Sequence, residues 1–164
     1  MLYAVLVAAL VAIDQVVKYL VRANIPLGGD VPFLPHILHL TYVQNTGAAF
    51  SLLEEHTWIL TIVSLVVSVL LVVLLVKKGF PRPFAMAALS MVLAGAVGNL
   101  IDRALLGYVT DMFETLFMRF AVFNVADICV VCGAVLAVIY YLWFYEKYDK
   151  RGKAHGDADA PSES

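Results

Sequence analysis

The sequence predicts an all-α integral membrane protein with four transmembrane helices. Hydrophobic residues make up 62% of the 164 residues and charged residues only 15%, whereas soluble domains average about 45–50% and about 25%. The mean hydropathy of +0.88 excludes an ordinary soluble domain. The length predicts a single domain, so any active site must lie within or beside the bilayer.

Four stretches are apolar over the roughly 20 residues that a helix needs to cross a bilayer. They cover residues of about 2–21, 58–76, 84–106 and 120–144. The first contains Asp14, Gln15 and Lys18. A cleavable signal peptide is the alternative there, but the first residues lack a basic region and no small-residue cleavage site follows. We therefore expect a permanent span.

Polar residues interrupt three of the four spans. In the first, Lys18 follows Asp14 by one helical turn, which favours an ion pair whose lysine reaches outward towards the membrane surface. The second, residues 58–76, has no charged residue and is the clearest span. The third carries Asn99, Asp102 and Arg103 near its end, and the fourth carries Asn124 and Asp127 near its start. Such groups must face protein or water.

The distribution of basic residues predicts the orientation, because short cytoplasmic loops are rich in Lys and Arg. These residues follow spans two and four: Lys77, Lys78, Arg82, Lys147, Lys150, Arg151 and Lys153. Residues 24–57 contain neither Lys nor Arg. Both termini are therefore predicted to be cytoplasmic, and residues 24–57 and 107–119 to lie on the outer side. The polar tail, residues 147–164, is predicted to be disordered.

This topology brings the polar residues of spans one, three and four to one depth near the outer surface. If span four begins at Phe120, Asp127 lies about 10 Å below its start. An ionisable residue inside a span costs several kcal/mol, so each is a candidate functional residue. A substrate that reaches this depth should be membrane-bound. Nucleic acid is excluded as a partner, because 11 basic and 13 acidic residues give a net charge of −2.

Three acids on the outer side are candidates for catalysis: Asp102, Asp111 and Asp127. Two close carboxylates share a proton, so that one can act as a base towards water and the other as an acid towards a carbonyl. Such a pair can hydrolyse an amide without a metal or another cofactor. Arg103 and Asn99 could instead brace Asp102, and Asp111 could be a solvated loop carboxylate. The residues alone do not show whether Asp102 or Asp111 is the partner of Asp127.

Two other pairs resemble metal or redox motifs, and we interpret both as structural. Cys129 and Cys132 lie inside the apolar fourth span with no further cysteine in the chain, so we expect small buried hydrophobic residues. His36 and His39 are interpreted as loop histidines. No metal site is predicted.

Five motifs occur in order along the chain. They are Asp14 and Gln15 with Lys18, then residues 45–50 (NTGAAF), 98–103 (GNLIDR), 109–112 (VTDM) and 123–127 (FNVAD). Together, over about residues 2–145, they resemble lipoprotein signal peptidase, the type II signal peptidase of bacteria.

The resemblance implies an inner-membrane aspartic endopeptidase that cleaves prolipoproteins just before the diacylglyceryl-modified cysteine of the lipobox. It assigns the catalytic pair to Asp111 and Asp127 and leaves Asp102 in support. The positions that it implies for substrate binding or support are Asp14, Lys18, Asn45, Gly47, Asn99, Asp102, Arg103, Asn124 and Ala126. Prolipoprotein and membrane lipid are then the expected partners of a cofactor-free monomer.

The family fold also implies a small extracytoplasmic sheet and a short amphipathic helix within residues 24–57 and 107–119. Gly47, Ala48 and Ala49 would allow backbone or lipid to approach closely. This chain departs from the family pattern at Thr110, where a second valine is common, and at Ile128 and Cys129, where small hydroxyl residues are usual.

The main alternative function is a small membrane carrier or proton relay, because intramembrane acids also mark ion paths. Carriers place their site near the midplane between repeats, whereas these acids gather at the outer end and the halves show no repeat. A purely structural membrane subunit would not need three acids at one depth.

Overall fold

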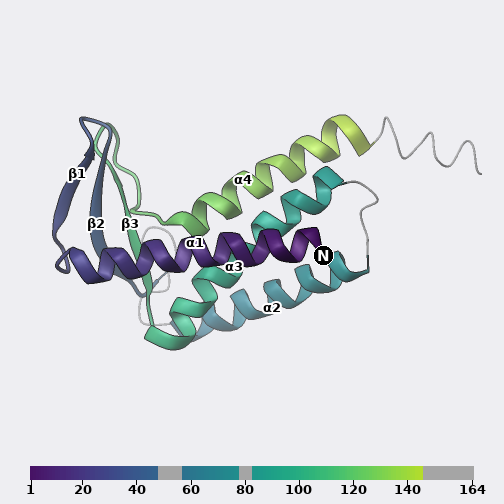
Figure 1. Cartoon of the computed structure of the whole chain (residues 1–164), viewed down its shortest axis with the longest axis horizontal. Helices are drawn as coiled ribbons and strands as arrows, with labels where there is room; N and C mark the ends of the chain where they lie inside the picture. The colour runs from purple at the N-terminus through teal and green to yellow at the C-terminus, as the bar shows by residue number, and fades with distance from the viewer. Residues whose placement is uncertain (48–56, 78–82, 146–164) are drawn as a thin grey trace, which may run out of the picture.

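The computed structural model describes residues 1–47, 57–77 and 83–145. Its helices are α1 (Leu2–Asn24), α2 (Thr57–Val76), α3 (Pro83–Leu106) and α4 (Val125–Ile139), and a π-helical turn, η2 (Tyr140–Tyr145), continues α4. Three strands, β1 (Asp30–Leu34), β2 (Leu38–Asn45) and β3 (Val109–Thr115), form a small sheet that crosses one end of the helices (Figure 1). The predicted tail, residues 147–164, lies outside the described residues.

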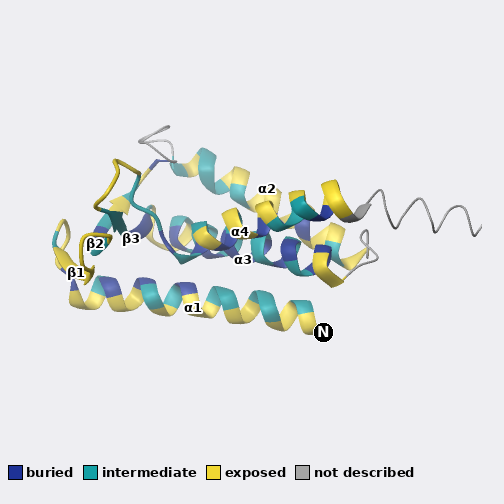
Figure 2. Cartoon of the chain, turned by 90° about the horizontal axis from the view of Figure 1, so that it is seen from above, coloured by how far each residue is buried: buried dark blue, intermediate teal, exposed yellow. Residues whose placement is uncertain are grey.

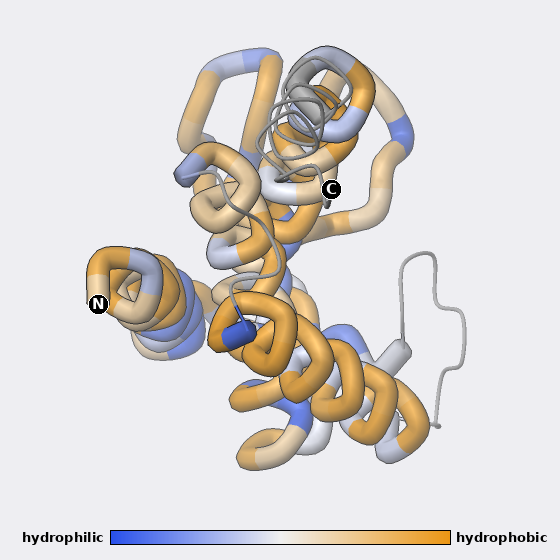
Figure 3. Tube along the Cα trace, turned by 90° about the vertical axis from the view of Figure 1, so that its right-hand side faces the viewer, coloured by the Kyte–Doolittle hydropathy of each residue, from blue (hydrophilic) through white to orange (hydrophobic). Residues whose placement is uncertain are grey.

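The four predicted spans are confirmed as helices. Each helix, α4 together with η2, is long and apolar enough to cross a membrane. Exposed residues cover the outer faces of the helices in Figure 2, and Figure 3 shows that many residues along the helices are hydrophobic. In the most apolar 18-residue stretch of α2, only 6% is buried inside the protein. Most of this surface must therefore face lipid, because exposure of so much apolar surface to water is unfavourable.

Helix α3 is the central helix, and α1, α2 and α4 all pack against it. Glycines permit its close approach to α4. A Cβ atom at Gly95 would overlap the carbonyl oxygen of Ala126, and one at Gly133 would lie 2.6 Å from the carbonyl oxygen of Ala88. In lipid no hydrophobic driving force brings helices together, so their association depends on close packing. Small residues permit this close packing.

The predicted start of the fourth span at Phe120 is wrong, because α4 begins at Val125. Phe123 forms an antiparallel bridge with Phe113 of β3, which keeps the preceding backbone out of the helix. Asn124 then caps α4, and Asp127 lies in its first turn instead of about 10 Å below the helix start. Helix α1 ends at Asn24, three residues beyond the predicted boundary of Val21.

The sheet joins two segments that are far apart in the sequence, in the order β1-β2-β3 with antiparallel pairing. Gly107, with a φ of 78°, turns the chain from α3 into β3. A small core of Val21, Ile25, Tyr42 and Met112 fixes the sheet to the end of α1. The described parts of residues 25–47 and 107–119 contain no helix, so the amphipathic helix stays a prediction.

Candidate active site

Asn124 lies between Asp111 and Asp127 and binds to both. Its side-chain amide nitrogen Nδ2 donates to Oδ1 of Asp111 at 2.6 Å. Its Oδ1 accepts from the backbone nitrogen of Asp127 at 2.9 Å, and its own backbone nitrogen donates to Oδ2 of Asp127 at 3.1 Å. This reciprocal pair is a capping box, the arrangement that satisfies free donors at a helix N-terminus. Strand β3 and helix α4 are thus joined through one side chain.

Two further amides complete the hydrogen bonding of the two carboxylates. Asn45, at the end of β2, donates to Oδ2 of Asp111 at 2.9 Å. Asn99, on α3, donates to Oδ1 of Asp127 at 2.8 Å. Each of the four carboxylate oxygens therefore accepts a hydrogen bond from an uncharged N–H group. Such donors fix the orientation of a carboxylate without adding a full positive charge beside it.

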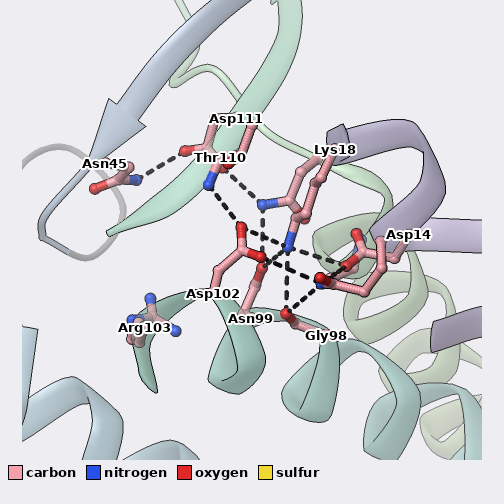
Figure 4. Close-up of polar contacts among 12 residues, drawn as sticks. Asp14, Lys18, Asn45, Gly98, Asn99, Asp102, Arg103, Thr110 and Asp111 are labelled. Atoms are coloured by element: carbon pink, nitrogen blue, oxygen red, sulfur yellow. Dashed lines mark hydrogen bonds and ion pairs between the residues drawn. The ribbon is translucent and has the colours of Figure 1, made fainter. Parts of the chain in front are cut away.

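Lys18 is completely buried at the centre of a second cluster, among Asp14, Gly98, Asn99 and Asp102 (Figure 4). Its Nζ atom lies 3.0 Å from Oδ2 of Asp14 and 3.4 Å from Oδ2 of Asp102, and it donates to Oδ1 of Asn99 at 2.9 Å. The predicted ion pair with Asp14 is confirmed. The outward reach predicted for Lys18 is wrong, because two acids and an amide inside the protein bind its ammonium group.

The Asp14 carboxylate also connects α1 to the start of α4. Its Oδ1 accepts from the backbone nitrogen of Ala126 at 2.9 Å. Ala126 is fully buried, and its N–H is one of the free donors of the first helical turn. A carboxylate at a helix N-terminus also interacts favourably with the helix dipole. Helix α1 thereby helps to fix the turn that carries Asp127.

Asp102 braces the structure, although its partners are not those that the sequence suggested. Its Oδ2 accepts from the backbone nitrogen of Thr110 at 2.9 Å, and its Oδ1 lies 3.9 Å from Arg22. The alternative partners, Arg103 and Asn99, are not among the hydrogen-bond or ion-pair partners of Asp102 in the described part of the chain. Arg103 instead donates to Oγ of Ser64 on α2 at 3.4 Å, and its Nε atom is buried without a hydrogen-bond partner among the described residues.

A cavity of about 160 Å³ lies beside the two hydrogen-bonded acids. One part of its lining is polar, and the segment before α4 contributes apolar residues. The lining consists of Asn45, Asn99, Arg103, Val109, Asp111, Phe120, Ala121, Val122, Phe123, Asn124 and Asp127. Asp111 and Asp127 line this space, and Asp102 is absent from the described lining. A water molecule occupies about 30 Å³ in the liquid, so the cavity can hold water together with a small polar group.

Burial raises the pKa of Asp111, which is only 2% exposed, from 3.8 to about 6. The nearby Asp127 also raises this pKa, while the hydrogen bonds from Asn45 and Asn124 and the charge of Lys18 lower it. The largest cause is the loss of water around the carboxylate, which disfavours its charged form. Asp111 can therefore keep a proton at mildly acidic pH.

The signal peptidase (SPase) II family model matches residues 6–143 of this chain. The chain belongs to the signal peptidase II family. It is 46% identical over 151 residues to a lipoprotein signal peptidase from Enterococcus faecalis, and the aligned region covers 92% of this chain and 93% of that relative. It is 38% identical over 139 residues to one from Brevibacillus brevis, which covers 85% and 93%. Membership makes the chain a membrane peptidase, a hydrolase.

Two solved bacterial membrane enzymes share the fold of this signal peptidase II family member. The structure determined in meso at 2.3 Å has a TM-score of 0.80 and 32% identity, and covers 85% of this chain and 87% of that chain. The second, determined at 1.9 Å, has a TM-score of 0.79 and 31% identity, with 87% and 93% covered. The predicted fold class is thus confirmed.

The structure brings most of the predicted site residues of this family member into one network. Gly47 joins it because its backbone nitrogen donates to Oδ1 of Asn45 at 3.0 Å, which orients that amide. Arg103 lines the cavity instead of joining the Lys18 cluster. Ala48 and Ala49 lie outside the described residues.

Three residues of the network were missing from the predicted site: Gln15, Arg22 and Thr110. Gln15 donates to the carbonyl oxygen of Gly98 at 3.0 Å, and Arg22 donates to Oγ1 of Thr110 at 2.8 Å. The spacing could have indicated Arg22, because it follows Lys18 by one helical turn and faces the same way.

The two pairs that resemble metal or redox motifs lie on different elements, with His39 on β2 and the two cysteines on α4. No cluster of three His, Cys, Asp or Glu residues suited to a metal occurs in the part of the chain that is described. His39 lies in β2, so its interpretation as a loop histidine is wrong, and it pairs with Asp30 at 3.0 Å. Cys129 is buried as expected, but Cys132 is exposed, so that the prediction of two buried cysteines is wrong. Cys132 lies on a helix whose exposed surface is apolar.

Proposed function

We propose that this protein removes signal peptides from prolipoproteins as an aspartic endopeptidase, with Asp111 and Asp127 as its catalytic pair. The observation that supports the proposal best is the hydrogen bonding of both carboxylates around one cavity. All four carboxylate oxygens accept uncharged N–H donors, from Asn45, Asn99 and Asn124. These donors fix the orientation of both carboxylates towards the same cavity, where one can act as the acid and the other as the base.

In this mechanism Asp111 is the protonated acid and Asp127 the base. The raised pKa of Asp111 favours a proton there, and the N-terminus of α4 favours a negative charge on Asp127. Asp127 removes a proton from a water molecule in the cavity as the water oxygen attacks the scissile carbonyl. Asp111 donates its proton to the carbonyl oxygen. The tetrahedral intermediate then breaks its C–N bond as Asp127 gives its proton to the leaving amine and Asp111 takes a proton from the hydroxyl that becomes the new carbonyl.

The other polar residues support this pair. Lys18 orients Asn99, whose amide then binds Asp127. Both Asp14 and Asp102 lie beside the ammonium group of Lys18, so that this buried cluster adds no net positive charge to the site. Arg103 lines the cavity. Its Nε–H, which has no hydrogen-bond partner among the described residues, can donate to a backbone carbonyl of the substrate.

The position of the site supports a lipid-modified substrate. With cytoplasmic termini, the ends of α1 and α3 and the start of α4 face the extracytoplasmic side of a bacterial cytoplasmic membrane. A substrate cysteine that carries two acyl chains holds its preceding peptide bond at this interface. The apolar residues Phe120 to Phe123 line one part of the cavity, where they can contact a substrate that enters from the bilayer. Cleavage just before the modified cysteine then follows from where the lipid places the bond.

The test is cleavage of a diacylglyceryl-modified prolipoprotein by the purified protein in detergent, with the unlipidated precursor as the control. Asp111→Asn and Asp127→Asn should abolish cleavage, since each removes one member of the acid–base pair. Asp102→Asn is the matched control, because it alters a neighbouring buried acid outside the described lining and should retain residual activity. Normal cleavage by Asp111→Asn would refute the catalytic pair. If the folded wild-type protein did not cleave the substrate, the alternative function of a small membrane carrier or proton relay would be favoured.

A further inference from the structure

One end of the sheet carries an exposed apolar surface that the proposed reaction does not use. We call it the apolar tip and define it by six residues: Phe33, Leu34, Ile37, Leu116, Phe117 and Met118. Their exposed fractions range from 43% for Leu116 to 66% for Phe117. Large apolar side chains gathered at one exposed site usually mark an interaction surface.

Backbone hydrogen bonds bring the two halves of the apolar tip together. Leu38 of β2 pairs with Thr115 of β3, and the backbone nitrogen of Leu116 donates to the carbonyl oxygen of Ile37 at 3.0 Å. Thr115 also donates to the carbonyl oxygen of Met118 at 3.1 Å, which fixes the turn after β3. The tip is therefore a built part of the sheet.

The charge of this region favours a lipid surface as its partner. Residues 31–38 and 115–120 contain no Asp or Glu, and Arg119 is their only residue with a permanent charge. The carboxylate of Asp30 lies outside this region and pairs with His39. Aromatic and aliphatic side chains beside an arginine are typical of segments that lie at the boundary between headgroups and acyl chains.

The apolar tip is also continuous with the surface that must face lipid. It leads through Phe120, which is 51% exposed, into α4. The exposed residues of α4 include Ile128, Val131, Val135 and Val138, which repeat at helical spacing on one face. In Figure 1 the strands run across the helix direction and the turn between β1 and β2 lies beyond the start of α4, and Figure 2 shows β1 as exposed.

We propose that the apolar tip inserts into the outer leaflet of the bilayer beside α4, as a membrane contact separate from the four spans. It ties β3 to the membrane surface at one end, while Asp102 ties the other end of β3 to α3. Asp111 lies between these two attachments. The contact would thus hold the acid and the cavity at a constant depth in the bilayer.

The test measures where a tryptophan at the tip lies in reconstituted vesicles. Phe117→Trp is introduced into the full chain with Trp58→Phe and Trp143→Phe, which removes both native tryptophans. We expect its fluorescence to be quenched by lipids brominated in the acyl chain, as strongly as that of a protein retaining only Trp58. We also expect it to be protected from iodide in the water.

The matched control is Leu27→Trp in the same background. Leu27 is apolar and 61% exposed, and it precedes β1 at the end opposite the tip. It should be quenched by iodide and less by the lipid label. Iodide quenching at position 117 would overturn the proposal, as would shielding from both quenchers, which indicates a protein partner. Equal lipid quenching at both positions would also overturn a contact specific to the tip. None of these results depends on peptidase activity, so the proposed function is tested separately.

Discussion

The carboxylate of Asp14 accepts a hydrogen bond from the backbone nitrogen of Ala126 at 2.9 Å, although 112 residues separate them. This bond joins the first helix of the chain to the first turn of the last. The same carboxylate pairs with Lys18. A buried acid on α1 thereby positions Asp127 without lining the cavity itself.

Replacement of Asp14 by alanine should destabilise the protein strongly. The change leaves an N–H of α4 without its partner and removes one of two acids beside buried Lys18. Breaking a buried ion pair costs about 3–5 kcal/mol. Thermal unfolding in detergent measures the loss, and Asp30→Ala is the matched control. Because Asp30 is 56% exposed in its pair with His39, its loss should cost less than about 1 kcal/mol. Equal effects would contradict the role given to Asp14.

Gly98→Ala should reduce activity more than its effect on stability explains. A Cβ atom there would lie 2.6 Å from Oδ2 of Asp14 and 3.2 Å from Cβ of Ala126, so it must displace the group that positions α4. Gly133→Ala is the matched control, because its Cβ meets α3 deeper in the same helix pair, 2.6 Å from the carbonyl oxygen of Ala88. Both variants should unfold at lower temperature. Only Gly98→Ala should lower kcat of the folded enzyme, and an equal kcat for the two would contradict this.

The cleavage rate should fall as the pH rises through about 6. The mechanism needs a proton on Asp111, whose pKa burial raises to about 6. The profile of kcat/KM against pH should therefore have an alkaline limb near that value. Asn45→Ala should move this limb to higher pH, because the Asn45 hydrogen bond lowers the pKa of Asp111. A limb that moves to lower pH would show that Asp111 does not act as the acid.

Stability should also depend on the protonation of Asp111. Between pH 3.8 and about 6 the folded protein keeps this proton while the unfolded chain loses it. The contribution of Asp111 to stability therefore falls as pH rises across that window and is constant above it. The pKa difference corresponds to about 3 kcal/mol. Asp111→Asn should remove this slope, so that unfolding of the variant compared with wild type between pH 4 and 7 measures it. Parallel curves would contradict the raised pKa.

Arg22 and Thr110 should be energetically coupled. Arg22 donates to Oγ1 of Thr110 at 2.8 Å, immediately before Asp111. A hydrogen bond to a charged group contributes about 1.5–3 kcal/mol when partly buried. Thermodynamic stabilities of Arg22→Met, Thr110→Val and the double variant should give a coupling of about 1 kcal/mol or more. Additive effects would mean that the bond is absent in the membrane-bound protein.

Hydropathy was sufficient to predict the four helices, because each is apolar over a length that crosses a bilayer. It failed at the start of α4. Phe120 to Phe123 are as apolar as the helix that follows, and hydropathy does not reveal the bridge between Phe123 and Phe113 that precedes α4. The strands within residues 24–57 were expected only from the family resemblance. The sequence around them does not reveal their pairing, because β2 pairs with β3, which is far away in the sequence.

The candidate site was predictable in its residue types but less so in its contacts. Asn99, Asp102 and Lys18 were placed at one depth by helix geometry alone. That Lys18 turns inward follows from partners about 80 residues away, which spacing within α1 does not indicate. Whether Asp102 or Asp111 lines the cavity likewise depends on the turn at Gly107, because this turn leads into β3 and places Asp111 beside the cavity.

The pairing of Lys18 with Asp14 has a consequence for biosynthesis. Both residues belong to α1, one turn apart, so their charges can neutralise each other before any other span is made. Insertion of an isolated charge near the middle of a bilayer costs about 2.5–3.5 kcal/mol. The first helix can therefore leave the translocation channel with its charges already matched. Asp102 and Asn99 engage the same lysine only when α3 follows, and Ala126 completes the cluster last.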